Sequence, residues 1–245
     1  MMIVLSIVSI MVYNQVGTLM KDTTEKQIKQ TAIEANGRME TLYKQIDTLS
    51  NQLMTNGTVQ QILLGLKNGE SVDFSKRQSL IRVINNFLAY SNGISSFELY
   101  SSEGKRIYPF GDKKLSTVID EKWVNLAESE KGRLVWVGKD PKNSNYSYAI
   151  RRVSLMDRWF SNGGYLVVKI ANSYFQVEES NLNPGEKDYM MLLDRDLTPI
   201  TDHYGIDIQN FLLEGYETIK VNKTDYMIVK QPSSKTGWTL VILKP

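Results

Sequence analysis

Two carboxylates stand close together in the stretch DYMMLLDRDLTPITD, at Asp194 and Asp196. On one continuous strand they would face the same side of the sheet, and such a pair could bind a cation or transfer a proton. The stretch lacks the glycine and the distal glutamate of a calcium loop. We therefore interpret both residues as part of a charged turn, and we predict no catalytic residue and no metal site.

Other reactive groups are scarce in the sequence. The chain has no cysteine, which removes disulfides, thiolate metal ligands and cysteine nucleophiles. Its one histidine, His203, cannot form a zinc site alone, and we expect a polar residue near a turn. There is no Gly-x-Ser-x-Gly elbow, no His-Glu-x-x-His and no glycine-rich nucleotide loop. We predict that this chain is not an enzyme and uses no cofactor.

The composition describes a folded protein without a strong electrostatic field. The chain has 245 residues, of which 42% are apolar, enough for one large or two small domains. Its 29 Lys and Arg against 27 Asp and Glu leave a formal net charge of +2. So small an excess gives no basic surface for a phosphate backbone, and we predict no binding to nucleic acid.

The elements that would position a site begin with an apolar N-terminus. The segment MMIVLSIVSIMVY has no charged side chain, and the first one in the chain is Lys21. This run of about thirteen residues is shorter than the roughly twenty that cross a bilayer, and it lacks the basic start and cleavage site of a signal peptide. We interpret residues 1–20 as the outer part of a membrane-spanning helix whose beginning lies outside this sequence. The alternative is a buried core helix.

A heptad pattern follows the apolar segment. Its members alternate at spacings of four and three: Ile28, Ala32, Ala35, Met39, Leu42, Ile46, Leu49 and Leu53. The pattern predicts one helix of about forty residues, roughly 60 Å long. The seam can pack against the same chain or form a homodimer, and both can hold on successive stretches.

Two shorter helices complete the segment 21–93. The pattern at Thr58–Gln61 resembles a capping box, and residues 68–69, Asn-Gly, would close that helix. The same device recurs at Ser75–Gln78, and residues 92–93, again Asn-Gly, would end the second helix. We expect a long juxtamembrane helix followed by a helical hairpin.

Strand patterns begin at residue 94 and occur in two series. The first reads ISSFELYS, KRIYPFG, the amphipathic helix DEKWVNLAES, then RLVWVGKD, YSYAIRRVS and GYLVVKI. The second reads DYMMLLDRD, TPITD, the helix GIDIQNFLLEG, then YETIKV, DYMIVKQPS and GWTLVILKP. We predict an α+β fold with two modules, each an antiparallel sheet of about five strands with an inserted helix.

This order of elements resembles the double Cache sensor domain, two PAS-like modules found outside the membrane in bacterial histidine kinases and chemoreceptors. The strands GYLVVKI and GWTLVILKP, which close the two modules, look most like those of Gram-positive sensor kinases of the YesM type. The resemblance implies a membrane-distal module at 94–183 and a membrane-proximal module at 184–245. It also implies a second membrane helix, then a HAMP linker and a kinase or methyl-accepting domain beyond this sequence.

The resemblance implies a receptor function. The modules would lie outside the cytoplasm of a protein of the cell membrane, a homodimer in the full receptor, and would pass a ligand-induced change through the long helix. A two-component sensor histidine kinase is the leading interpretation. The alternatives are a chemoreceptor sensor domain, or a surface module that binds a partner such as a solute-binding protein.

The resemblance also places a small-molecule site in the distal module, between the sheet and its inserted helix. Aromatic planes with a few polar groups are typical of such sites. The candidate ligand-binding residues are Tyr100, Trp123, Trp136, Tyr148, Arg151 and Lys169. The alternative for each tryptophan is an ordinary core position.

The type of ligand follows from a departure from the family pattern. Amino-acid-binding Cache domains resemble one another in an Arg-x-Trp-Tyr stretch, where this chain has Glu121 and Val124 around its tryptophan. They also carry an aspartate near the end of the last distal strand, where this chain has Lys169, which would repel an ammonium group. We therefore expect an anionic ligand, an organic acid or acidic sugar. Of two adjacent arginines only one can face the pocket, and we choose Arg151 over Arg152. The alternative for Lys169 is a solvated charge at a strand end.

Overall fold

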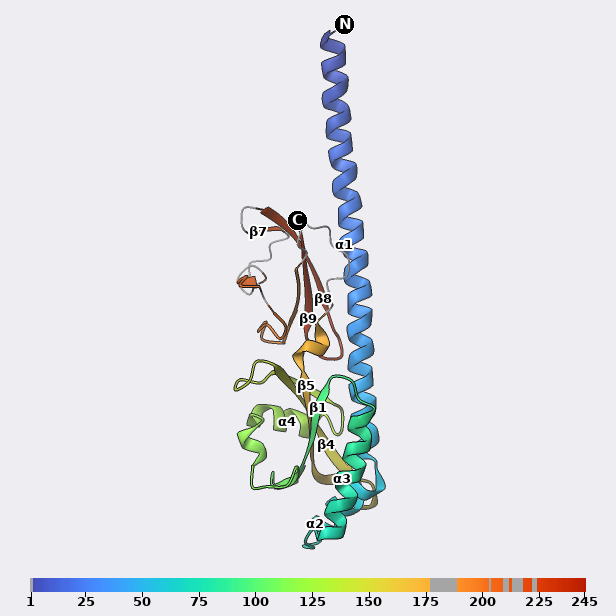
Figure 1. Cartoon of the computed structure of the whole chain (residues 1–245), viewed down its shortest axis with the longest axis vertical. Coiled ribbons are helices and arrows are strands. Elements are labelled where there is room, and N and C mark those ends of the chain that lie inside the picture. The colour runs from blue at the N-terminus through green and yellow to red at the C-terminus, as the bar shows by residue number, and fades with distance from the viewer. Residues whose placement is uncertain (1, 177–188, 203, 209–211, 213–217, 222–223) are drawn as a thin grey trace.

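A computed structural model describes residues 2–176, 189–202, 204–208, 212, 218–221 and 224–245. One long helix runs beside two antiparallel sheets that follow each other along its length (Figure 1). Among the described residues, the first sheet has five strands and lies farther from the N-terminus, and the second has four. The predicted α+β fold, a long helix followed by two antiparallel modules, is confirmed.

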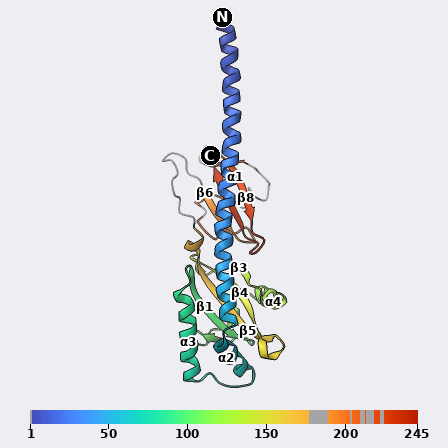
Figure 2. The ribbon, with the colours of Figure 1, turned by 90° about the vertical axis from the view of Figure 1, so that its right-hand side faces the viewer.

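The long helix α1 spans Met2–Met54, 53 residues, more than the predicted forty. From Ile28 onward the heptad positions are buried or half-buried, and Tyr43 joins them. They pack on two strands of each sheet, so α1 crosses both sheets on one side (Figure 2). Packing within the chain therefore accounts for the heptad pattern over this stretch.

Two short helices, α2 (Gly57–Lys67) and α3 (Phe74–Ala89), follow α1. Their predicted N-caps are wrong, because each helix begins one residue before the predicted capping residue. The side chain of Asn56 accepts a hydrogen bond from Thr58 N at 3.0 Å. The side chain of Asp73 accepts one from Lys76 N at 2.8 Å. Both caps are the short polar side chains that accept bonds from the free N–H groups of a first turn.

The first sheet has the strand order β2-β1-β5-β4-β3. Its strands are β1 (Ile94–Ser101), β2 (Arg106–Tyr108), β3 (Val135–Lys139), β4 (Tyr146–Leu155) and β5 (Ser161–Ala171). The inserted helix α4 (Glu121–Ser129) packs on β3 and β4. Short 3-10 turns lie at Leu115–Thr117, Met156–Arg158 and Asn172–Phe175. The strands and the helix lie where the alternation of side chains predicts them.

The second sheet has the order β6-β9-β8-β7. Its strands are β6 (Tyr189–Leu193), β7 (Thr218–Val221), β8 (Thr224–Pro232) and β9 (Thr239–Lys244). The strand predicted at TPITD is absent from the described part of this sheet, because TPITD makes a single bridge between Pro199 and Leu193. Most of the predicted helix GIDIQNFLLEG lies outside the described residues.

An aromatic cluster joins the helix to both sheets. Tyr43 of α1 packs edge-on against Trp136 of β3, with ring centroids 5.0 Å apart, and against Trp238 at 5.8 Å. Trp136 and Trp238 lie 5.2 Å apart, and Phe175 lies 5.5 Å from Trp238. All four rings are buried, so one apolar core spans α1 and the ends of both sheets.

Candidate functional site

The two faces of the first sheet have different partners. One face packs on α1 and shares the core with the second sheet, and the other packs on α4 and the turn before it. Because side chains alternate along β4, Arg151 lies on the α1 side while Tyr148 and Arg152 lie on the α4 side. The residues predicted to bind a ligand are divided between these faces.

The α4 side carries buried tyrosines whose hydroxyls bond to carboxylates. Tyr100 of β1 is fully buried and donates to Glu98 Oε2 at 2.5 Å. Burial and the bond to Glu98 both raise the pKa of Tyr100 well above its ordinary value. Glu98 is 8% exposed, so a carboxylate lies inside this face beside an apolar cluster.

A second tyrosine and a lysine lie on the neighbouring strands. Tyr148 of β4 is buried and donates to Asp140 Oδ2 at 3.0 Å, and burial raises its pKa, as does this bond. Tyr148 pairs in register with Lys169 of β5. Lys169 Nζ lies 4.1 Å from the ring centroid of Tyr146 and 6.0 Å from that of Tyr148, a cation–π arrangement. The sheet therefore brings Tyr100, Tyr148 and Lys169 to one face.

The helix α4 covers this face with Trp123. The indole is half-buried against the same apolar cluster, and Lys122 Nζ lies 4.9 Å from its ring centroid. Farther along the face, Glu128 of α4 accepts bonds from Tyr165 at 2.5 Å and from Arg152 at 3.2 Å. These bonds tie the helix to β4 and β5.

Two predicted residues lie on the opposite face. The prediction that Arg151 points toward Lys169 is wrong, because Arg151 is buried against α1, ion-paired with Asp47 and bonded to Asn51 Oδ1 at 3.1 Å. Burial lowers the pKa of the Arg151 guanidinium. The neighbouring Asp47 carboxylate raises this pKa and so offsets part of the lowering. Trp136 packs beside Tyr43 in the aromatic cluster. This is the ordinary core position that we gave as the alternative to ligand binding.

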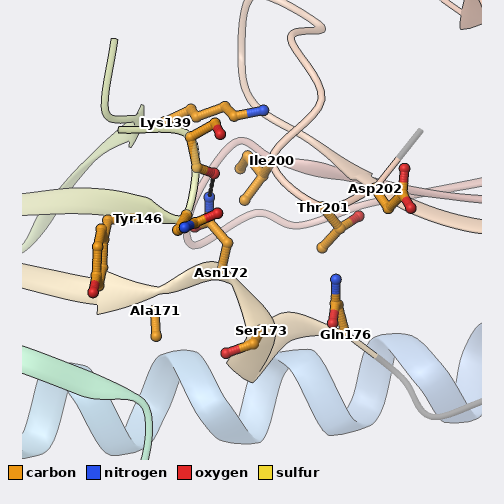
Figure 3. Close-up of a pocket in the computed structure, with 11 residues that line it drawn as sticks. Lys139, Tyr146, Ala171, Asn172, Ser173, Gln176, Ile200, Thr201 and Asp202 are labelled. Carbon is orange, nitrogen blue, oxygen red and sulfur yellow. Dashed lines mark hydrogen bonds between the residues drawn. The ribbon is translucent and has the colours of Figure 1, made fainter. Parts of the chain in front are cut away.

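A cavity of about 480 Å³ opens where the two sheets meet (Figure 3). Lys139 and Tyr146 lie on its first-sheet side, and Thr201 and Asp202 lie across from them (Figure 3). Lys139 Nζ crosses the junction and donates to the Pro199 carbonyl at 3.1 Å. Tyr146 contacts Lys169 on the α4 side of the first sheet and also lines this cavity, whose volume is in the range of small-molecule sites.

The carboxylate pair of the second half forms a turn, as expected. Asp194 Oδ1 accepts bonds from Asp196 N at 2.9 Å and from Thr198 N at 2.8 Å, so its side chain closes its own loop. Burial raises the pKa of Asp194. Gly138 packs against Asp194, where an added Cβ would come within 2.9 Å of a carboxylate oxygen. His203 lies outside the described residues.

Sequence reasoning missed Glu98 and Asp140 on the α4 side, and it rejected Arg152 in favour of Arg151. A signal for Glu98 exists in FELY, where a charge lies two residues before a buried tyrosine and so shares its face. Asp140 follows β3, and its approach to Tyr148 depends on the strand pairing, which a linear pattern does not define. Whether the predicted residues bind a ligand stays a prediction.

Solved structures similar to this chain include extracellular, sensory and ligand-binding domains of histidine kinases and chemoreceptors. The extracellular domain of a protein assigned as the histidine kinase vpHK1S-Z8 superposes with a TM-score of 0.67 at 11% identity, covering 91% of this chain and 95% of that one. The sensory domain of the Campylobacter jejuni chemoreceptor Tlp3 with isoleucine bound gives 0.61 at 13% identity, covering 92% and 94%. This chain shares their fold.

A third similar structure is, like that of Tlp3, a complex with a ligand. The ligand-binding domain of the Pseudomonas aeruginosa PAO1 amino acid chemoreceptor PctC in complex with GABA gives a TM-score of 0.60 at 11% identity, covering 91% of this chain and 100% of that one. No family model and no curated protein matches the sequence. At these identities the likeness concerns the fold.

Proposed function

We propose that this chain is the extracytoplasmic ligand-sensing domain of a bacterial membrane receptor. The shared fold with sensor domains of histidine kinases and chemoreceptors supports this assignment. A two-component sensor histidine kinase of the YesM type is the leading receptor class, and a chemoreceptor is the alternative. The proposed modules are the segments 94–183, distal to the membrane, and 184–245, proximal to it.

Membrane attachment is proposed through the N-terminal end of α1, with residues 1–20 entering the bilayer and residues 21–93 beginning outside it. Met11, Tyr13 and Leu19 are 71%, 80% and 61% exposed, so apolar side chains on this part of the helix face outward. Among the described residues, no helix contains an apolar stretch long enough to cross a membrane. In the receptor, this outward-facing surface is available to lipid or to a second copy in a homodimer.

The proposed ligand is a small anion, an organic acid or an acidic sugar, bound on the α4 side of the first sheet. The observation that carries this proposal is Lys169, a half-buried cation that lies over the ring of Tyr146. It forms no ion pair with another residue of the described part of the chain. A ligand carboxylate would supply the missing charge. Glu98 and Asp140 would accept bonds from ligand hydroxyls, which suits a sugar acid or a hydroxy acid.

An amino-acid ligand is the second candidate. Glu98 and Asp140 are carboxylates on this side of the sheet that sequence reasoning had not counted, and either could accept an ammonium group. Lys169 would then take the ligand carboxylate. The similar folds of PctC, solved with GABA, and of Tlp3, solved with isoleucine, support this candidate.

The proposed signal is a change in the first sheet that reaches the membrane through α1. Arg152 bonds to Glu128 of α4, and its neighbour Arg151 bonds to Asp47 of α1, so adjacent residues of β4 hold helices on opposite faces. Movement of α4 around a ligand would shift β4 and bias the position of α1. A ligand moves this equilibrium only by its difference in affinity for the two states.

A thermal-shift screen tests the ligand proposal. The chain would be screened against organic acids, uronic acids, neutral sugars, amino acids and polyamines, because a ligand at about a hundred times its Kd stabilises the fold by about 2.7 kcal/mol. We expect a shift of a few degrees with an acid, its loss in Lys169→Met, and its retention in the control Lys230→Met, a lysine exposed on β8. A shift with neutral sugars alone, or one retained in Lys169→Met, would contradict an anion site.

A further inference from the structure

The hairpin between β4 and β5 has an unusual turn. After the 3-10 turn Met156–Arg158, both Trp159 and Phe160 have left-handed backbone conformations, with φ of 52° and 56°. The turn is closed by Phe160 N donating to the Leu155 carbonyl at 3.0 Å, and the Phe160 carbonyl accepts from Arg152 Nη2 at 2.6 Å. The backbone is therefore fixed although its conformation is costly for bulky side chains.

The side chains at this turn are apolar and exposed. Trp159 is 98% exposed, Phe160 is 66% exposed and Met156 is 49% exposed. Left-handed positions favour glycine or asparagine, and the chain has both nearby, at Asn162 and Gly163, but not at the turn. Two aromatic residues thus stand where they cost backbone energy and add nothing to the core. Strain and exposure together point to a role for these side chains outside the chain's own packing.

Hydrogen bonds to the helix α2 hold the exposed turn in place. Gln60 of α2 donates to the Ser154 carbonyl at 3.1 Å and accepts from Met156 N at 3.1 Å. Lys67 Nζ donates to Ser161 Oγ at 3.0 Å. The hairpin is therefore bonded to α2, which lies at the end of the molecule opposite the N-terminus (Figure 1). A rigid base means that contacts made by the turn do not require ordering of a loop.

A recess of about 520 Å³ lies beside the turn. Trp159, Phe160, Met156 and Met54 supply its apolar wall, and Lys131 and Arg152 supply its cations. Two further cations lie close by: Arg158 bonds to Asn68 Oδ1 at 2.9 Å, and Lys67 bonds to the hairpin as above. Within the described part of the chain, Lys67, Lys131 and Arg158 form no ion pair. Asp157 is the one acidic residue in the turn 156–160.

We propose that this tip, Met156 with Arg158, Trp159 and Phe160, is the docking site of an acidic extracytoplasmic protein. Protein interfaces are enriched in aromatic residues, methionine and arginine, and tryptophan and arginine dominate binding hot spots. The partner that fits has a recess for the indole, bordered by carboxylates that complement Lys67, Lys131 and Arg158. A bilayer fits the tip less well, because the tip lies at the end of the molecule opposite the apolar N-terminal part of α1 (Figure 1).

Photo-crosslinking in the full receptor in its host cell locates the partner. Benzoylphenylalanine would replace Phe160, and the matched control would replace Tyr90, an aromatic residue 85% exposed on another surface. We expect position 160 to crosslink one acidic extracytoplasmic protein at a yield about tenfold above that at position 90. Crosslinking to lipid, to a second copy of the receptor, or at the control level only would overturn the proposal.

Binding of the purified crosslinked protein then tests the tip itself. We expect Trp159→Gly to weaken its affinity for the receptor domain by about tenfold or more, and Arg158→Glu to weaken it and reduce its salt dependence. Because glycine relieves the left-handed backbone, Trp159→Gly should raise the midpoint of thermal unfolding by about 2 °C. Unchanged affinity in Trp159→Gly would overturn the proposal. Small-molecule binding at Lys169 would be unaffected by either result, so the two proposals fail separately.

Discussion

The two faces of the first sheet are built from the same strands and have opposite chemistry. The face on α1 is apolar and aromatic, and the buried cation Arg151 is ion-paired there with Asp47 of α1. The face on α4 has tyrosine hydroxyls bonded to carboxylates and an unpaired lysine among the described groups. One face is a core that packs on α1, and the other has polar groups of the kind that the proposed ligand site would use.

In the proposed sensor, this difference would separate ligand binding on one face from the packing that holds α1 on the other. Polar groups on the α4 side can change partners when a ligand binds, because water or ligand can replace their bonds. The packed aromatic face resists small rearrangements, so we expect it to move with α1 as a unit in the proposed sensor. Substitutions on the two faces should therefore differ in kind: stability on one side and binding on the other.

The largest expected effect is on the α1 face. Trp136→Ala removes a ring packed against Tyr43 and Trp238 and should lower the free energy of unfolding by about 4 kcal/mol. Urea denaturation measures this, with Trp159→Ala as the matched control, expected to stay within about 0.5 kcal/mol. Equal losses in both variants would mean that the cluster is not the core that joins the sheets.

The next effect concerns the buried cation of that face. Asp47→Ala leaves the Arg151 guanidinium buried without its carboxylate and should cost about 2 kcal/mol. Arg151→Met removes the charge itself and leaves an Asp47 that is 56% exposed, so it should cost about 1 kcal/mol. The order of the two losses, measured by chemical denaturation, is the test. A larger loss in Arg151→Met would indicate that the guanidinium bonds to Asn51 and to the Asp47 carbonyl hold α1 more strongly than the ion pair does.

A smaller effect is expected on the α4 face. Tyr100→Phe removes the hydroxyl that donates to Glu98 and leaves a buried carboxylate short of a donor, at a cost of about 1 kcal/mol. Glu98→Gln in the same background should restore part of the loss, since a neutral amide costs less to bury. Thermal unfolding of both variants checks the order. No recovery in the double variant would show that Glu98 has another source of stabilisation.

The smallest effect is a pH dependence at the far end of this face. Burial and the bond to Glu128 raise the pKa of Tyr165 from 10.0 to about 12. The neutral phenol is therefore the form that the fold favours, and its contribution is complete below about pH 10 and is lost as the pH rises through about 12. The difference in melting temperature between the wild type and Tyr165→Phe should shrink from pH 8 to pH 11. A difference that grows with pH would contradict this sign.

The sequence predicts backbone elements better than it predicts the faces to which side chains point. ISSFELYS is β1 residue for residue, because alternation and the following turn define both ends. The choice between Arg151 and Arg152 failed, because adjacent strand residues differ only in which helix lies above each face. Asn56 escaped notice as a cap, because Thr58 two residues later has an equally good pattern. The exposed turn at Trp159 carries no periodic signal at all.

The measurement that most directly tests the division between the faces is a calorimetric titration of three proteins with the acid selected in the screen. The wild type, Lys169→Met and Arg151→Met would be titrated under conditions where all three are folded. The expected result is an affinity about tenfold or more lower in Lys169→Met, and an affinity within about twofold of the wild type in Arg151→Met. Loss of affinity in Arg151→Met with affinity retained in Lys169→Met would contradict the account, because it would place recognition on the face that packs on α1.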